Sequence, residues 1–306
     1  MSFGLGRGRV LDDAPGIVGI AVEGAAGGVV GVVGGVEGVG GVERAAGEIR
    51  VELPVLPDAI GENPRAGFVD PRAWFVAPDH PLEIEIGSGK GTFLVQQAML
   101  EPEINFLGIE WAREFYLYAA DRVRRRRLRG ERGVSGGRGV SGGLGNVRLL
   151  NTDATSFLRW RVPDGIVRVV HLYFSDPWPK TRHHKKRVVQ DRFLADVWRV
   201  LAPGGELRVV TDHDDLWAWD CAHFDRWTGQ AGWELLGSYG YDMDAALPGH
   251  GPFVRERFDR PASAGGGELV GTNFERKFRR AGKGFHAIVL RKMARGQQRV
   301  GSGPCA

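Results

Sequence analysis

Hydrophobic residues occur along most of the chain in short continuous runs, separated by longer mixed segments, from Leu82 onward. Such runs are typical of strands that are covered on both faces. Strands that alternate with helices indicate an α/β fold with a doubly wound, mostly parallel sheet and helices on both faces. The predicted strands, which make a seven-stranded sheet, are 82–86, 105–110, 146–150, 167–174, 206–211, 233–239 and 285–291. The predicted helices are 92–100, 113–127, 189–201 and 215–228.

Several segments fall outside this alternation. Residues 1–48 are mostly Gly, Val and Ala; glycine dilutes their hydrophobicity and carboxylates interrupt it, which argues against a membrane span and a signal peptide. We predict a disordered low-complexity extension there, a domain over 49–293 and a tail over 294–306. A duplicated hexapeptide predicts an exposed, glycine-rich loop insertion at 130–145. Dense prolines at the start of the domain predict an irregular arm, packed on the domain by Phe68, Trp74 and Phe75.

The first predicted strand runs into a glycine turn with the sequence Gly87-Ser-Gly-Lys-Gly-Thr92. Glycines let the backbone turn sharply and let a ligand approach it closely. A P-loop is excluded because Lys90 is followed by Gly91, and a dinucleotide fingerprint matches poorly because position 92 is Thr. The segment from Glu85 to Gly91 resembles the first-strand motif of class I methyltransferases, which use S-adenosylmethionine, and a turn without a ligand is the remaining alternative. The glycines that would contact the cofactor are Gly87, Gly89 and Gly91.

Acidic residues stand at the ends of the predicted strands, namely Glu85, Glu110, Asp153, Asp176 and Asp212. Because the carboxyl ends of parallel strands share one edge of a sheet, we expect these side chains to gather where a ligand binds. Glu110 lies about 20 residues beyond the turn, the spacing of an acid that binds ribose hydroxyls. In a methyl-transfer site Asp153 would accept from the adenine amino group, and Glu85 would lie near the cationic end of the cofactor. Each acid alone is also compatible with a helix cap or a loop.

The most specific stretch is Phe174-Ser-Asp-Pro-Trp-Pro-Lys-Thr-Arg-His-His-Lys-Lys-Arg187. It resembles the signature loop of the bacterial tRNA (guanine-N7)-methyltransferases, with Lys186 where the family has an arginine. A second stretch, Thr272-Asn-Phe-Glu275, is similar to the Thr-x-Phe-Glu motif of the same family. The resemblance extends from about residue 65 to residue 292. It leaves the extension, the loop insertion and the tail outside.

This resemblance implies a Rossmann-like class I methyltransferase that moves a methyl group from S-adenosylmethionine to N7 of a guanosine in the variable loop of tRNA. Guanine N7 carries a lone pair and no proton, so its attack needs no general base. The resemblance assigns Asp176 to catalysis and to the cofactor side, where its charge would stabilise the cationic product. The residues that it assigns to the substrate are Lys180, Arg182, Lys185, Arg187, Asp212, Thr272, Asn273, Phe274 and Glu275.

Other residues of the signature loop leave alternatives open. The cations between Lys180 and Arg187 form either a solvated helix start or a phosphate-binding surface. Trp178 either stacks on a nucleobase or anchors the loop. His183 and His184 indicate RNA contacts or loop packing rather than a metal site, since neighbours on one segment seldom both ligate a metal.

Composition narrows the choice of partners and compartment. A net charge of +4 and an isoelectric point of about 9.2 are mildly basic, so RNA binding must rest on local clusters. The 2 cysteines, Cys221 and Cys305, are far apart; they support neither a disulfide framework nor a four-ligand zinc site, and they fit a reducing cytosol. We expect a cytoplasmic enzyme, a monomer or a homodimer, without metal or membrane contact. The alternatives are a methyltransferase for another RNA or a non-RNA acceptor, a dinucleotide oxidoreductase and a non-catalytic RNA-binding module.

Overall fold

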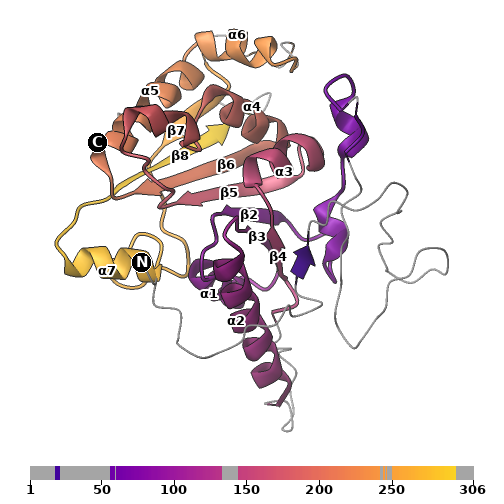
Figure 1. The fold of residues 1–306 in the computed structure, drawn as a ribbon, viewed down its shortest axis with the longest axis vertical. Coiled ribbons are helices and arrows are strands. Elements are labelled where there is room, and N and C mark those ends of the chain that lie inside the picture. The colour runs from indigo at the N-terminus through magenta and orange to yellow at the C-terminus, as the bar shows by residue number, and fades with distance from the viewer. Residues whose placement is uncertain are drawn as a thin grey trace.

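The computed structural model describes residues 18–20, 56–58, 60–132, 144–241, 244, 246 and 250–293. A single sheet with helices on both faces forms its centre (Figure 1). The strands are β1 Val18–Ile20, β2 Leu82–Ile86, β3 Asn105–Ile109, β4 Val147–Asn151, β5 Val167–Tyr173, β6 Leu201–Thr211, β7 Phe253–Glu256 and β8 His286–Lys292. The helices are α1 Thr92–Leu100, α2 Arg113–Arg132, α3 Ala154–Arg161, α4 Asp191–Val200, α5 Asp214–Thr228, α6 Ala231–Ser238 and α7 Asn273–Arg280. The short 3-10 helices are η1 Pro64–Gly67, η2 Pro71–Trp74 and η3 Thr181–Lys186.

The strand order is β1-β4-β3-β2-β5-β6-β8-β7. Neighbouring strands from β1 to β6 are parallel, and β8 is antiparallel to both β6 and β7. From β2 the chain moves outward through β3 to β4, and it then returns to the other side of β2 with β5. The predicted doubly wound, mostly parallel sheet is therefore confirmed. Ligands of such sheets bind beyond the carboxyl ends of the strands where the order reverses, here at β2 and β5.

Side chains alternate across the sheet, so each central strand contributes to two layers. Ile84 points to the face that α3, α4, α5 and α6 cover, where the largest apolar cluster lies. On the opposite face α1 and α2 pack on β3 and β4 through residues such as Leu94 and Leu149. Glu83 and Glu85 alternate with Ile84 and lie in this second layer. The acidic side chains of β2 therefore share a layer with the helix that follows the glycine turn.

One predicted strand is wrong, because residues 233–239 lie in helix α6 and the turn that ends it. Trp233 and Leu236 are buried whereas Glu234 is exposed, which is helical spacing. An apolar run this short does not distinguish a buried helix from a strand. The seventh strand of the domain is instead β7, in which Phe253 is buried and the other residues are half-buried.

Most of the extension 1–48, most of the insertion 130–145 and the whole tail 294–306 lie outside the described residues. Within the extension, β1 is described, and it pairs in parallel with β4. The predicted arm before β2 is confirmed: Trp74 is buried, and the Arg148 guanidinium lies 5.1 Å from the centroid of the Phe75 ring. In the part of the chain that is described, no helix combines the length and the apolar character needed to cross a membrane.

Candidate active site

The glycine turn joins β2 to α1 at the centre of the sheet. Gly87, Gly89 and Gly91 have φ angles of 70°, 53° and 64°, in the left-handed region that favours glycine. A Cβ on Gly87 would meet nothing within 4 Å, whereas a Cβ on Gly91 would lie 3.0 Å from the Cβ of Ala119. Gly91 thus lets α1 approach α2 closely. Gly87 leaves the backbone open to a ligand.

Glu110 ties the end of β3 to this turn. Its Oε2 accepts a hydrogen bond from the Gly89 N–H at 2.7 Å, and its Oε1 accepts one from the Ala112 N–H at 2.8 Å. Burial raises the pKa of Glu110, backbone hydrogen bonds from Ala112, Gly89 and Trp111 oppose that rise, and the charge of Asp176 adds to it. Glu110 and Asp176 are therefore within electrostatic range of each other. The two carboxylate oxygens of Glu110 offer about four acceptor sites, so the side chain can still accept a hydrogen bond from a ligand hydroxyl.

Glu85 is buried in the same layer and is only partly satisfied. It accepts a hydrogen bond from the backbone N–H of Leu94, while its Oε2 has no hydrogen-bond partner among the described residues. Burial raises the pKa of Glu85 well above its ordinary value, and the charge of Glu110 adds to the rise. The buried Ser88 Oγ likewise has no partner in the described structure. Buried polar atoms are normally hydrogen-bonded, so these two fit a ligand that brings donors and positive charge.

Two other acids at the strand ends already have partners. The Oδ1 of Asp153 accepts hydrogen bonds from the Ser156 N–H at 2.7 Å and the Thr155 hydroxyl at 2.6 Å. Asp153 is therefore the N-cap of α3, as one of the two interpretations expects. Asp212 accepts a hydrogen bond from the Lys283 ammonium at 2.9 Å. Both carboxylates keep lone pairs beyond these bonds at the carboxyl edge of the sheet.

The loop after β5 has an unusual backbone on both sides of Asp176. Phe174 has a φ of 56° and Trp178 has a φ of 42°, in a region that aromatic residues rarely adopt. Such conformations concentrate at functional sites and persist only where surrounding contacts impose them. The Phe174 N–H donates to the Val210 carbonyl at 2.7 Å, and Pro177 restricts Asp176 to extended conformations. The loop thus presents an exposed carboxylate in a fixed position.

Trp178 anchors the second half of this loop. Its ring centroid lies 5.8 Å from that of His183 and 4.6 Å from the Lys186 ammonium. These contacts favour the anchoring interpretation of Trp178 over base stacking. The segment from residue 181 to 186 forms η3, in which no residue is buried. The exposed cations on and before η3 that remain for an anionic partner are Lys180, Arg182 and Lys185.

The second motif begins helix α7 and lies against α1. The Thr272 hydroxyl caps α7 by accepting from the Glu275 N–H at 3.0 Å. The Asn273 side-chain amide donates to the Thr92 hydroxyl, at the first residue of α1, at 3.2 Å. Phe274 is 46% exposed, and its ring centroid lies 5.3 Å from that of Phe174. The two motifs that carry the family resemblance therefore meet at the carboxyl edge of the sheet.

Two residues that the resemblance assigns to the substrate point into the protein instead. Arg187 is 2% exposed and hydrogen-bonds to oxygen atoms of its own loop and of α5. Glu275 is fully buried and accepts hydrogen bonds from the backbone N–H groups of Val270 and Gly271, each at 2.9 Å. In this structure both side chains shape the site without facing a ligand. Residue type and motif position do not reveal which way such side chains point.

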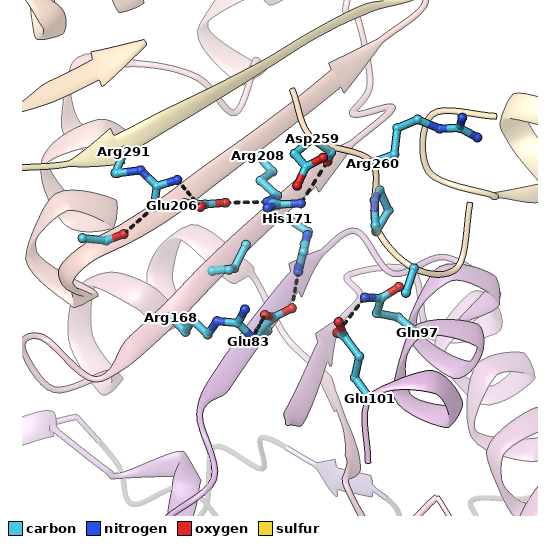
Figure 2. Close-up of a pocket in the computed structure, with 14 residues that line it drawn as sticks. Glu83, Gln97, Glu101, Arg168, His171, Glu206, Arg208, Asp259, Arg260 and Arg291 are labelled. Carbon is cyan, nitrogen blue, oxygen red and sulfur yellow. Dashed lines mark hydrogen bonds and ion pairs between the residues drawn. The ribbon is translucent and has the colours of Figure 1, made fainter. Parts of the chain in front are cut away.

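A polar cavity of about 310 Å³ lies on the same face of the sheet, nearer the amino ends of the strands (Figure 2). Its charged residues are largely paired: Glu83 bonds to His171 at 2.8 Å, and Glu206 bonds to Arg208 at 2.6 Å. Arg208 also donates to the Asp259 carbonyl at 3.1 Å. This contact ties the segment before α7 to the sheet, and so it helps to fix the second motif.

Sequence reasoning missed two contacts that join these pieces. Thr92, considered only as a mismatch to the dinucleotide fingerprint, accepts hydrogen bonds from Asn273 and from Arg122 Nη1, the latter at 2.7 Å. Lys283 pairs with Asp212. A signal existed for Lys283, because it ends a cationic cluster that follows the second motif. No sequence signal pairs Thr92 with Asn273, since only the fold brings α1 and α7 together.

Half of the chain, residues 79–231, matches the sequence model of a family described as putative methyltransferases. A tRNA (guanine-N(7)-)-methyltransferase from Streptococcus equi subsp. equi is 34% identical over 171 residues, which cover 54% of this chain and 73% of the relative. Another, from Streptococcus pyogenes serotype M6, is 36% identical over 149 residues, 49% of this chain and 63% of the relative. The crystal structure of the aminoglycoside resistance methyltransferase NpmB1 is 17% identical with a TM-score of 0.41 over 70% of this chain and 87% of that chain, too weak a similarity to bear on fold or function. The chain belongs to the same family as these tRNA (guanine-N(7)-)-methyltransferases.

Proposed function

We propose that this protein transfers the methyl group of S-adenosylmethionine to N7 of a guanosine in the variable loop of tRNA, which forms 7-methylguanosine. One observation carries the proposal: the Asp176 loop, the glycine turn and the Thr272–Glu275 motif meet at one edge of the sheet. The names of the two curated relatives support the same reaction. Fold alone would not distinguish among methyl acceptors.

The residues of the edge fit the cofactor. S-adenosylmethionine supplies an electrophilic methyl group on a cationic sulfur. The unsatisfied Oε2 of Glu85 and the Ser88 hydroxyl suit its cationic amino-acid end. Glu110 would accept from the ribose hydroxyls, and Asp153 would accept from the adenine amino group. The backbone that Gly87 leaves open allows the close approach that such a ligand needs.

For this reaction the protein must align the reactants and stabilise the positive charge that develops on the purine. Because guanine N7 presents a lone pair without a proton, no base is needed, and holding the reactants in line can lower the barrier by about 7–11 kcal/mol. The purine becomes cationic as the methyl group arrives, and the Asp176 carboxylate stabilises that charge from its fixed loop. Asp176 also suits hydrogen bonds from guanine N1–H and the amino group. Adenine lacks that pair of donors.

The surface around Asp176 suits a polyanion. Lys180, Arg182 and Lys185 are exposed on the same loop, and arginine binds phosphate in a bidentate manner. The half-exposed ring of Phe274 offers a stacking face at the mouth of the site. Reaching N7 in folded RNA requires that the nucleotide be exposed from its stack. We assign the enzyme to the cytoplasm, where tRNA is modified, as a monomer or a homodimer.

The test is incubation of the purified protein with labelled S-adenosylmethionine and unmodified bulk tRNA, followed by nucleoside analysis. We expect a 7-methylguanosine peak with the wild type and none with Asp176→Ala, whose circular dichroism should match the wild type. The control is Asp225→Ala. It removes an exposed carboxylate of α5 that pairs with Arg255 of β7, and it should keep full activity. Methylation of ribosomal RNA but not of tRNA would contradict the proposed substrate. Full activity in Asp176→Ala would contradict the assigned catalytic residue.

A further inference from the structure

Arg187 is the last cation of the signature loop, and its side chain is turned inward. It is 2% exposed, whereas the other cations of the loop, Lys180, Arg182, Lys185 and Lys186, are exposed. A phosphate contact requires that a guanidinium reach the surface. The burial of Arg187 therefore calls for a different role.

One end of the Arg187 guanidinium holds the residue next to Asp176. Its Nε donates to the carbonyl of Pro177 at 2.9 Å. Pro177 lies between Asp176 and Trp178, and the Trp178 backbone has a φ of 42°. A left-handed aromatic residue is disfavoured by itself, so the surrounding contacts must impose this conformation. The bond to Pro177 is such a contact, made beside the carboxylate.

The other end of the guanidinium is fixed to helix α5. Nη2 forms an ion pair with the Asp215 carboxylate, and Nη1 lies 3.4 Å from the Asp215 carbonyl. The face of the guanidinium lies over Trp219, 5.3 Å from the ring centroid. The indole N–H of Trp219 in turn donates to the Val189 carbonyl at 2.7 Å. The guanidinium is thus held at its edges and at one face. Its bond to Pro177 joins the two ends of the loop segment 177–187.

We propose that Arg187 is a positioning residue, which fixes the Asp176 carboxylate relative to the cofactor edge and makes no contact with tRNA. This inference rests on the proposed function, because it assigns a role within the same reaction. Arg187 acts through Pro177, and its effect is on the alignment of Asp176 with the substrate. A misplacement of about 1 Å far from the chemistry can cost on the order of a hundredfold in rate.

The first test compares Arg187→Lys with Arg182→Ala. Lysine keeps the charge but cannot bond to Pro177 and Asp215 in one plane, so we expect kcat to fall by about tenfold to a hundredfold. KM for tRNA, the dissociation constant of S-adenosylmethionine and the salt dependence of tRNA binding should stay at wild-type values. Arg182→Ala should show the opposite pattern, with weaker tRNA binding, a higher KM for tRNA and a log–log salt slope that is smaller by about 0.7–0.9.

A second pair of variants covers the case in which Arg187→Lys does not fold. Asp214 and Asp215 are consecutive exposed acids in the first turn of α5, so the two carboxylates interact with the helix dipole to a similar extent. Asp215 pairs with Arg187, whereas Asp214 pairs with His286 at 2.8 Å. We expect Asp215→Ala to lower kcat with KM for tRNA unchanged, and Asp214→Ala to keep kcat.

The outcomes separate this inference from the proposed function. A wild-type protein that makes no 7-methylguanosine refutes the proposed function before any variant is compared. With an active wild type, a reduced salt slope in Arg187→Lys at unchanged kcat shows a phosphate contact and overturns the positioning role. Equal kcat in the wild type, Arg187→Lys and Asp215→Ala overturns it as well.

Discussion

The ring of Phe274 lies against the ring of Phe174, with 5.3 Å between their centroids. Phe174 begins the loop that carries Asp176, and Phe274 belongs to the first turn of α7. A third ring, that of Phe278, lies 4.5 Å from Phe274. The contact thus joins the two motifs of the family through aromatic rings at the start of the loop that carries Asp176.

We predict that Phe274→Ala weakens substrate use without unfolding the protein. The side chain is 46% exposed, so its removal costs little core packing. Stacking of a base on an aromatic ring is worth about 1–3 kcal/mol, so kcat/KM for tRNA should fall by about fivefold to a hundredfold. Steady-state kinetics at constant salt measures the change. Leu100→Ala, which removes an apolar side chain that is 57% exposed on α1, is the matched control. Equal losses in both variants would refute a specific role for Phe274.

The exposed cations of the signature loop predict a measurable salt dependence. Lys180→Ala and Lys185→Ala should each weaken tRNA binding and reduce the log–log salt slope by about 0.7–0.9, because each removes one phosphate contact. Filter binding at several salt concentrations gives the slope. Arg65→Ala is the control, since Arg65 is 78% exposed but lies on η1 and pairs with Asp164. If the lysine variants keep the wild-type slope, these residues do not contact phosphate.

The state of Glu85 predicts that cofactor binding releases a proton. Burial and the charge of Glu110 raise the pKa of Glu85 well above its ordinary value, so the free protein keeps this proton to a higher pH than an ordinary carboxyl does. A cationic ligand favours the ionised carboxylate and lowers that pKa. The affinity for S-adenosylmethionine should therefore increase as the pH rises toward the pKa of the free protein. Calorimetry in buffers with different ionisation enthalpies measures the released protons. In Glu85→Gln both the release and this pH dependence should disappear, and their persistence would assign them to another group.

Sheet elements could be predicted where local signals agree. The apolar run of β2 ends in glycines with positive φ, and the turn is visible in the sequence because few other residues adopt that backbone. At β6 the predicted start, 206, is too late, because the strand begins at Leu201 and continues through Pro203 and Gly204. Pairing of Leu201 with Val167 on β5 imposes extended structure there. This pairing is a tertiary contact, so the local sequence around Leu201 does not predict it.

The chemistry of the candidate site was more predictable than the direction of its side chains. The position of the strand-end acids at one edge of the sheet follows from the parallel topology, because all carboxyl ends of the parallel strands lie there. The inward turn of Arg187 depends instead on Trp219 and Asp215, which come from a later helix. Glu275 likewise bonds to backbone N–H groups that exist only once the segment before α7 has folded. Such orientations are set by tertiary partners, and the motif alone does not contain them.

Asp220 on α5 predicts a pH-dependent cost in stability. It is 1% exposed, both carboxylate oxygens lack hydrogen-bond partners among the described residues, and burial raises its pKa to about 8 although the charge of Arg187 opposes the rise. The folded state therefore keeps a proton that the unfolded chain loses above its ordinary pKa of 3.8. Stability contributed by this proton is complete below that pH, falls as the pH rises and is lost by about pH 8.

The variant Asp220→Asn removes this titration while it keeps the shape of the protonated side chain. Its free energy of unfolding should exceed that of the wild type by a margin that grows by up to about 1.4 kcal/mol for each pH unit between pH 4 and pH 8. Urea unfolding at pH 5, 6.5 and 8 measures the margin. Asp225→Asn, which changes a carboxylate that is 68% exposed on the same helix, should show no such growth. A constant margin for Asp220→Asn would mean that the folded protein already holds Asp220 ionised, with Arg187 as its counter-charge.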